Sequence, residues 1–291
     1  MGAERRFLAG TYQFVSSPPP LLTSHSLFPS LSAAVLSCGL SYVKACVRFV
    51  HKATVVRVSL DPAFLLLSST IFHPQGGGQP SDTGTVVLPG RDGAAGVFSV
   101  SACRLDRDLD DIVHQGAFAN PGTAQADGWV AGAEVELRVC ESTRRLHARL
   151  HSAGHLLDAA MHNCGFDFPA TKGYHFPDAP SVEYTGNIEP EKREAARQAL
   201  EAECNRLVER ATAVEVMAEV DGDRAKSLCG ALGAGIASEE SLRLVRVTSD
   251  FDWCPCGGTH VENTMEIGKV VVTKVGFKKG SLKISYSLQG C

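Results

Sequence analysis

The sequence predicts an α+β protein, in which a small N-terminal β-barrel precedes an α+β domain. Between about residues 44 and 140, short apolar or β-branched runs alternate with turn-forming clusters such as 89–93, which is typical of a small barrel. From about Ser142 the apolar spacing becomes helical, and strand-like runs follow later, so helices and strands are segregated. We therefore divide the chain into an N-terminal extension, a barrel domain and a second domain. Their expected bounds are 1–43, 44–140 and 141–291.

Strands of the barrel are expected where β-branched and apolar residues cluster. The expected barrel strands are 54–58, 64–67, 84–88 and 135–139.

The second domain is expected to start with a helix and to continue with a second helix and several strands. The apolar residues of the first helix recur at helical spacing: Leu146, Leu150, Ala153, Leu157, Ala160 and Met161. A second helix is expected over 190–211, with Asn187 as a possible N-cap. Its buried stripe should consist of Leu200, Cys204, Leu207, Val208 and Ala211. Strands are expected at 214–220, 242–248, 267–275 and 282–288.

The segment 1–43 differs in composition from the rest. It is rich in Ser and Pro, contains Arg5 and Arg6, and carries one acidic residue, Glu4, before Asp61. Such a composition is typical of an organellar transit peptide, of a disordered tail, or of a start codon assigned too far upstream. We expect a cytoplasmic protein, with organellar import through this segment as the alternative.

Composition excludes several classes of protein. The net charge of −4 argues against nucleic-acid binding by bulk charge, and no apolar run approaches the roughly 18 residues of a membrane span. A local basic patch formed by Lys274, Lys278, Lys279 and Lys283 could contact a nucleic-acid backbone or simply protect a strand edge. The ten cysteines are scattered, which favours a reducing compartment. The sequence predicts no oligomeric state, and a monomer is compatible with it.

Two His and Cys motifs predict a metal site. His151 and His155 are four residues apart on the first expected helix, so both imidazoles lie on one face. Cys256 and His260 are also four apart, in a Cys-Gly-Gly-Thr-His segment that suggests a tight turn. Three imidazoles and a thiolate suit zinc, and we predict one zinc per chain. Either motif alone would more often be ordinary helix or loop surface.

A glycine-rich loop is the candidate substrate site. It reads Thr70-Ile-Phe-His-Pro-Gln-Gly-Gly-Gly-Gln79 and has neither P-loop nor dinucleotide-loop spacing. Gly76, Gly77 and Gly78 would let backbone N–H groups approach a small polar ligand, which the Gln79 amide and Thr70 hydroxyl could also bind. A plain hairpin connection is the alternative.

Together, this loop, His151-Ser-Ala-Gly-His155 and Cys256-Gly-Gly-Thr-His260 resemble the editing domain of alanyl-tRNA synthetase and its free-standing AlaX relatives. The segment from Lys172 to Asp178, followed by Val182-Glu-Tyr184, is also similar to that family. The resemblance spans about residues 50–288. No class II synthetase motifs accompany it, so a free-standing editing protein is expected.

The resemblance implies a deacylase that hydrolyses mischarged alanine tRNA, chiefly seryl-tRNA and secondarily glycyl-tRNA. It implies zinc held by His151, His155, Cys256 and His260, and substrate contacts by Thr70, Gln79 and the three glycines. His73 stands where the family often has tyrosine, and Cys254 adds a thiol beside the expected ligand. We prefer Cys256 as the ligand, because its spacing to His260 is that of the motif.

No side chain is assigned as catalytic beyond the zinc centre and its bound water. Four protein ligands would close a tetrahedral shell, whereas catalytic zinc keeps a position open. The shell could expand, one ligand could leave, or zinc could hold the substrate's amino group while another group activates water. A zinc hydrolase of another small ester or amide and a structural zinc module are the alternative functions. A peptidase would normally carry His-Glu-x-x-His, which is absent here.

Overall fold

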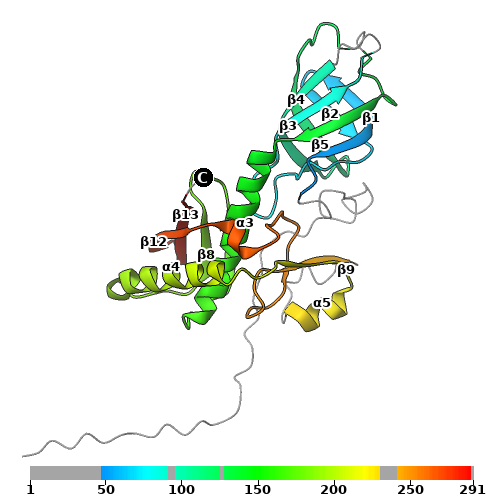
Figure 1. The fold of residues 1–291 in the computed structure, drawn as a ribbon. Helices are drawn as coiled ribbons and strands as arrows, with labels where there is room; N and C mark the ends of the chain where they lie inside the picture. Colours follow the sequence, from blue (N-terminus) through cyan, green and yellow to red (C-terminus); the bar gives the residue numbers. More distant parts are fainter. Residues whose placement is uncertain (1–46, 91–95, 125–127, 230–240, 290–291) are drawn as a thin grey trace, which may run out of the picture.

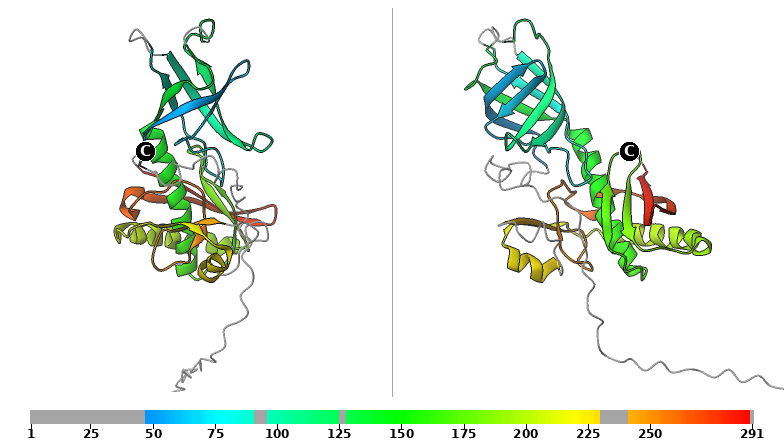
Figure 2. Two further views of the ribbon diagram at one scale, coloured as in Figure 1. Left: turned by 90° about the vertical axis from the view of Figure 1, so that its right-hand side faces the viewer. Right: turned by 180° about the vertical axis from the view of Figure 1, so that it is seen from behind.

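The computed structural model describes residues 47–90, 96–124, 128–229 and 241–289. The expected N-terminal extension 1–43 therefore lies outside the described residues. The predicted α+β class and the N-terminal barrel are confirmed: a six-stranded closed barrel is followed by a region of helices and smaller sheets (Figure 1). The long helix α3 runs from the barrel into this second region in all three views (Figures 1 and 2).

The barrel is closed by antiparallel strands in the order β1-β2-β5-β4-β3-β6. Their bounds are β1 Val50–Leu60, β2 Ala63–Leu67, β3 Gly84–Leu88, β4 Gly96–Asp106, β5 Asp111–Phe118 and β6 Glu134–Val139. The four strands expected from the sequence are confirmed as β1, β2, β3 and β6. The β4–β5 hairpin was not expected, because polar residues and Gly116 interrupt its apolar pattern. Phe98, Phe118 and Trp129 pack against one another in the barrel core.

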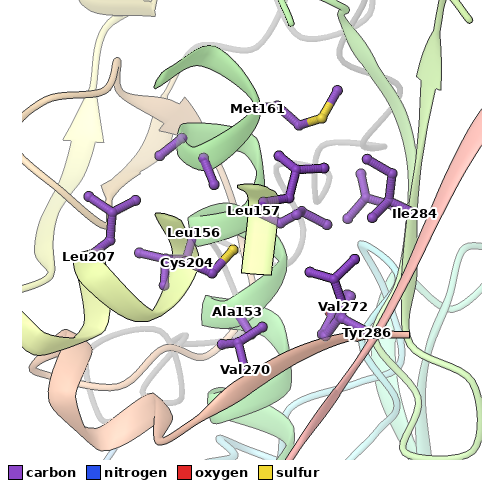
Figure 3. Packing of buried hydrophobic residues seen from close by; sticks show 14 of the residues in the cluster. Ala153, Leu156, Leu157, Met161, Cys204, Leu207, Val270, Val272, Ile284 and Tyr286 are labelled. Carbon is purple, nitrogen blue, oxygen red and sulfur yellow. The ribbon is translucent and has the colours of Figure 1, made fainter. Parts of the chain in front are cut away.

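Helix α3, Glu141–Asn163, begins two residues after β6 ends and confirms the predicted helical period. Its side chains are buried on more than one face, because one part of the helix contacts the barrel and another part the second region. Figure 3 shows Leu156 and Leu157 of α3 packed near Cys204 and Leu207 of the neighbouring helix α4. The helix is therefore the common support of both regions.

A four-stranded antiparallel sheet covers α3, in the order β12-β13-β8-β7. Its strands are β7 Ala170–Tyr174, β8 Ser181–Thr185, β12 Val270–Lys278 and β13 Ser281–Leu288. The last two confirm the expected strands, whereas β7 and β8 are short and were not expected as strands. Val272, Ile284 and Tyr286 of this sheet belong to the same core as Leu157 (Figure 3).

Helix α4, Arg193–Glu209, confirms the second expected helix but begins later than expected. A 3-10 turn, η1 Pro190–Lys192, precedes it, so Asn187 is not its N-cap. Instead, the Asn187 carboxamide oxygen accepts a hydrogen bond from Arg193 at 3.2 Å. The expected buried stripe is confirmed except at Ala211, which lies beyond the helix with a positive φ of 52° and is only half-buried.

The edge strand β12 is protected by side chains of α4. Asn205 accepts from the N–H of Val270 and donates to its carbonyl, at 3.0 and 2.8 Å. Arg197 donates to the carbonyl of Val272 at 3.0 Å, and Glu201 accepts from its N–H at 2.9 Å. Backbone groups that an edge strand would otherwise expose are thereby satisfied.

The lysines singled out in the sequence gather on the β12–β13 hairpin. Lys274 and Lys278 are exposed on the edge strand, and Lys279 is exposed in the turn. Lys283 lies on β13, paired in register with Glu183 of β8. This placement is compatible with both alternatives, edge protection and nucleic-acid contact.

A smaller sheet, in the order β11-β10-β9, carries the segment that leads into the Cys-Gly-Gly-Thr-His motif. Its strands are β9 Glu215–Val220, β10 Leu242–Arg246 and β11 Cys254–Pro255. Helix α5, Gly222–Cys229, follows β9 in the chain, and the 3-10 turn η2, Thr264–Ile267, follows the motif. The strands expected at 214–220 and 242–248 are confirmed as β9 and β10. Within the described ranges, no helix is long and apolar enough to cross a membrane.

Candidate metal centre

The four predicted ligands converge. His151 and His155 of α3 meet Cys256 and His260, and one ligand atom from each lies within 4.8 Å of all the others. Sγ of Cys256 lies 3.6 Å from Nε2 of His151 and 3.3 Å from Nε2 of His260. All four side chains are at most 9% exposed. Two helical ligands and two loop ligands therefore surround one point, as the spacing predicted.

The loop ligands are held by β10 and by close packing at Gly258. The N–H of Cys256 donates to the carbonyl of Arg243 at 3.0 Å, which extends the β10–β11 pairing to the ligand itself. A Cβ at Gly258 would lie 2.0 Å from Cε1 of His151, so no larger residue fits there without displacing that ligand. The glycine is thus explained by the approach of the loop to helix α3.

Hydrogen bonds orient two of the imidazoles toward the centre of the cluster. Nδ1 of His151 donates to Oε1 of Gln79 at 2.7 Å, which leaves its Nε2 free to face Cys256. Oγ of Ser152 lies 3.0 Å from Nδ1 of His260 and accepts from the N–H of Val261 at 3.2 Å. Metal-binding histidines usually engage their second ring nitrogen in this way.

The imidazoles have the protonation state that a metal requires. Burial, followed by the neighbouring imidazoles, lowers the pKa of His151 and His260 well below 6.5. Burial also lowers the pKa of His155 to about 4, with a smaller contribution from Arg243. Neutral imidazoles beside a buried thiol are the donor set of a zinc site, so these residues fit the predicted ion.

Cys254 is not part of this cluster. Its thiol donates to the carbonyl of Pro255 at 3.7 Å, and burial raises its pKa well above 9.0, followed by the neighbouring Cys256. Among the described residues, the cluster of candidate ligand atoms takes its sulfur from Cys256. The preference for Cys256 as the sulfur ligand therefore has a physical basis.

Gln79 lies against the ligands rather than in open space. Its Oε1 accepts from His151 and also from the N–H of Thr259 at 3.0 Å, while its Nε2 donates to Oγ1 of Thr259 at 2.8 Å. The side chain is fully buried. Three of its hydrogen-bonding positions are thus occupied by the metal-binding segments, and one N–H remains.

The glycine-rich loop forms a tight turn, as in the hairpin alternative, and the turn packs on β7. Gly76 and Gln79 exchange backbone hydrogen bonds of 3.1 and 2.9 Å, with Gly77 and Gly78 at positive φ. Gly78 accepts from the N–H of His175, and a Cβ on it would lie 2.4 Å from the carbonyl oxygen of Gly173. The missing side chain of Gly78 therefore lets the loop backbone approach β7, rather than a ligand. Gly76 faces open space.

Thr70 lies in the barrel, where its hydroxyl is 2.8 Å from Nε2 of His114. Nδ1 of His114 donates to the carbonyl of Leu65 at 3.2 Å, and burial lowers its pKa to about 4. A neutral ring that donates from Nδ1 accepts at Nε2, so the Thr70 hydroxyl is the donor. Its oxygen also accepts from the N–H of Phe72 at 3.0 Å.

A buried ion pair fastens the glycine-rich loop to α3. Arg144 and Asp82 are both fully buried, and Nε of Arg144 donates to the two carboxylate oxygens at 2.9 Å. Asp82 also accepts from the N–H of His73 at 2.6 Å, and Arg144 donates to the carbonyl of Ile71 at 2.6 Å. The loop and the helix that carries His151 are thereby held in one arrangement.

His175 is a site residue that ligand spacing alone did not identify. Its ring stacks on His151, with centroids 4.7 Å apart, and its Nδ1 donates to the Tyr286 hydroxyl at 2.7 Å. That hydroxyl donates in turn to the carbonyl of Leu150 at 2.9 Å. A Cβ at Gly154 would lie 2.3 Å from the His175 ring, which explains the glycine between the two helical ligands.

The site therefore combines a buried three-histidine, one-cysteine centre with a barrel loop that contacts its ligands. Residues 242–283 match the family described as the second additional domain of threonyl- and alanyl-tRNA synthetases. This segment contains Cys256 and His260.

Over most of its length the chain is similar to alanyl-tRNA editing proteins and to alanine–tRNA ligases, which confirms the resemblance inferred from the motifs. It is 28% identical over 232 residues to the alanyl-tRNA editing protein AlaX-L of Pyrococcus horikoshii, covering 79% of this chain and 52% of that protein. It is 31% identical over 238 residues to the alanine–tRNA ligase of Streptococcus thermophilus, covering 78% of this chain and 24% of the ligase. The chain thus spans about half or less of the length of these relatives.

Proposed function

We propose that this protein is a zinc-dependent aminoacyl-tRNA deacylase that hydrolyses mischarged alanine tRNA, chiefly seryl-tRNA and secondarily glycyl-tRNA. The observation that carries the proposal is the convergence of His151, His155, Cys256 and His260 beside the Gln79 loop. Similarity to an alanyl-tRNA editing protein supports the choice of substrate. A zinc hydrolase of another small ester or amide is the alternative.

The four ligands would hold one zinc ion, which supplies a Lewis acid and lowers the pKa of bound water. An aminoacyl ester is already activated, so the protein mainly has to hold its carbonyl in the correct orientation for attack by water. Gln79 and Ser152 fix the orientation of His151 and His260, and the ion pair of Arg144 with Asp82 fixes the loop that carries Gln79. These residues position the centre.

Discrimination against alanine requires a polar contact to the additional hydroxyl of serine. A site that hydrogen-bonds a substrate hydroxyl rejects an analogue without it more strongly than an apolar pocket can. Thr70 and the remaining N–H of Gln79 are the proposed contacts, with Gly76 at the open side of the turn. Lys278 and Lys279 are the proposed contacts to the tRNA backbone.

The test is release of labelled amino acid from Ser-tRNA(Ala), Gly-tRNA(Ala) and Ala-tRNA(Ala) by zinc-loaded protein. We expect serine to be released fastest and alanine to be spared. Parallel assays with small amino-acid esters, amides and peptides address the alternative. Hydrolysis of those compounds without acceleration on any charged tRNA would contradict the proposal.

A further inference from the structure

Strand β10 carries two arginines, and their guanidinium groups are in different states. NH2 of Arg246 donates to Glu215 at 2.7 Å, and its guanidinium lies over the ring of Trp253. Its charge therefore has an acidic partner, although its Nε is also buried without a hydrogen bond in the described part of the chain. Arg243 forms no ion pair with any described residue. It is only partly exposed, and its NH1 donates to the carbonyls of Cys256 and Gly258 at 2.6 and 3.0 Å.

The remaining edge of the Arg243 guanidinium is buried without an acceptor. Within the described part of the chain, both Nε and NH2 are buried and make no hydrogen bond. Arginine cannot discharge by losing its proton, and a buried charge without a partner is strongly unfavourable. Nε and NH2 together form the fork that matches two oxygens of a phosphate or carboxylate. An anion is therefore the complementary ligand of this edge.

We propose that Arg243 binds the phosphate of the terminal nucleotide whose ester is cleaved at the metal centre. The proposal rests on the proposed function and specifies how that site recognises its substrate. An aminoacyl ester carries no carboxylate, so the anions of a charged tRNA are its phosphates. The ligand would be the 5′-phosphate of the 3′-terminal adenosine.

The position of Arg243 favours this phosphate over the reacting carbonyl. Its NH1 contacts main-chain carbonyls of the ligand loop, not Sγ of Cys256 or the nitrogen atoms of the imidazoles. The guanidinium is thus bonded to the backbone of the ligand loop rather than to the candidate ligand atoms themselves. The ester carbonyl has to reach the point where those atoms converge, whereas the phosphate of the same nucleotide is separated from the ester by the ribose.

The test compares two small substrates that differ only in this phosphate, 2′(3′)-O-seryl-adenosine and its 5′-monophosphate. With zinc-loaded wild type, we expect the phosphate to raise kcat/KM by about 10- to 100-fold, the range for a charge-assisted hydrogen bond. Arg243→Met should remove most of this difference, so that the ratio of the two kcat/KM values falls toward one. The ratio is the readout, because loss of the NH1 bonds to the ligand loop would affect both esters alike. Arg243→Lys, which keeps the charge without the fork, should retain part of it.

Arg246→Met is the matched control, because Arg246 lies on the same strand and is paired with Glu215. It should preserve the effect of the phosphate. Equal loss on both esters in the Arg243 variants, with or without loss of zinc, would mean that Arg243 acts on the ligand loop or the carbonyl, and would overturn the inference.

Binding distinguishes this inference from the proposed function. Calorimetric titration with adenosine 5′-monophosphate and with adenosine requires no hydrolysis. We expect tighter binding of the monophosphate to wild type and no such preference in Arg243→Met. Arg243-dependent binding without hydrolysis of either ester would refute the deacylase and support the phosphate site. If the wild type deacylates its substrate but binds adenosine and adenosine 5′-monophosphate equally well, the deacylase is supported and the phosphate site is refuted.

Discussion

The two halves of the candidate site differ in what their polar atoms contact. In the half formed by α3 and residues 256–260, one atom from each of four side chains points to a common centre. In the half formed by the barrel loop, the polar groups are bound to protein: Gln79 to His151, Thr70 to His114, and Asp82 to Arg144.

This difference indicates a division of roles. The first half supplies the candidate metal ligands, and the second half holds those side chains in place. Tri-glycine loops commonly suggest a ligand cradle, but here Gly78 allows the loop to pack on β7. The loop can therefore contact a substrate only through the donors and acceptors that its hydrogen bonds within the protein do not use.

The largest expected effect is loss of the metal. We expect wild type to bind one zinc per chain, and both Cys256→Ala and His155→Ala to bind far less, because each removes one of four ligands. Deacylation should fall by at least about 100-fold, since zinc contributes several kcal/mol of charge stabilisation. Metal analysis of the purified variants measures the first effect, and release of serine from charged tRNA the second.

Cys254→Ala is the matched control, because it removes a neighbouring, half-buried thiol outside the cluster. It should retain zinc and activity. Undiminished zinc in both ligand variants, or loss of zinc in Cys254→Ala, would show that the four-ligand assignment is wrong.

The next effect concerns the connection between the two halves. Arg144→Met leaves Asp82 buried without its partner, which should lower the free energy of unfolding by about 3–5 kcal/mol. Urea denaturation measures this. Arg145→Met is the control, because Arg145 is exposed and its pair with Glu141 should contribute at most about 1 kcal/mol.

If Arg144→Met is too unstable to purify, the double variant with Asp82→Asn removes the uncompensated charge and should be recovered as folded protein. Asparagine can still accept from the N–H of His73. A loss below about 1 kcal/mol in the single variant would mean that the ion pair does not fasten the loop.

The sequence predicted the cluster of three histidines and one cysteine better than it predicted the surroundings of that cluster, for a physical reason. The ligands are encoded by two local spacings of four residues, so a short window of sequence suffices. The contact of Gln79 with His151 spans 72 residues and depends on how the loop folds against α3. Arg243 belongs to no motif, and its position follows from the pairing of β10 with β11.

A similar distinction holds for the fold. Helix α3 was predicted because apolar residues recur at helical spacing from Leu146 to Met161, within a helix of 23 residues. Strands β7 and β8 have only five residues each, and Gly173 interrupts β7. Strand β8 pairs with β13, β7 pairs with β8, and Gly173 of β7 packs against the His175 ring, none of which a local pattern encodes.

The next smaller effect concerns Gln79, which holds His151 and is also a proposed contact to the serine hydroxyl. Gln79→Met keeps the approximate shape and removes the bonds to His151 and Thr259. We expect zinc affinity to fall by about 10- to 100-fold, as is usual when a partner of a metal ligand is lost. Competition with a chelator measures the affinity. At saturating zinc the serine substrate should lose more activity than the glycine substrate, because the proposed contact of Gln79 to the serine hydroxyl is also lost.

Gln75→Met, an exposed position of the same loop, should leave zinc affinity unchanged. If Gln79→Met instead retains the zinc affinity of wild type, Gln79 does not orient a metal ligand. If the serine and glycine substrates lose activity equally at saturating zinc, Gln79 does not contact the serine hydroxyl.

The smallest predicted effect concerns the Thr70 hydroxyl, which donates to His114 in this structure. Thr70→Val keeps the shape and deletes the hydroxyl. If that oxygen also accepts a hydrogen bond from the serine side chain, kcat/KM should fall roughly tenfold for Ser-tRNA(Ala), about 1.4 kcal/mol, and change little for Gly-tRNA(Ala). Thr70→Ser keeps a hydroxyl and should preserve the preference for serine. An equal fall on the seryl, glycyl and alanyl substrates would assign Thr70 to the support of the barrel loop through His114. In that case the same equal fall should appear in His114→Phe, which removes the other partner of the hydrogen bond.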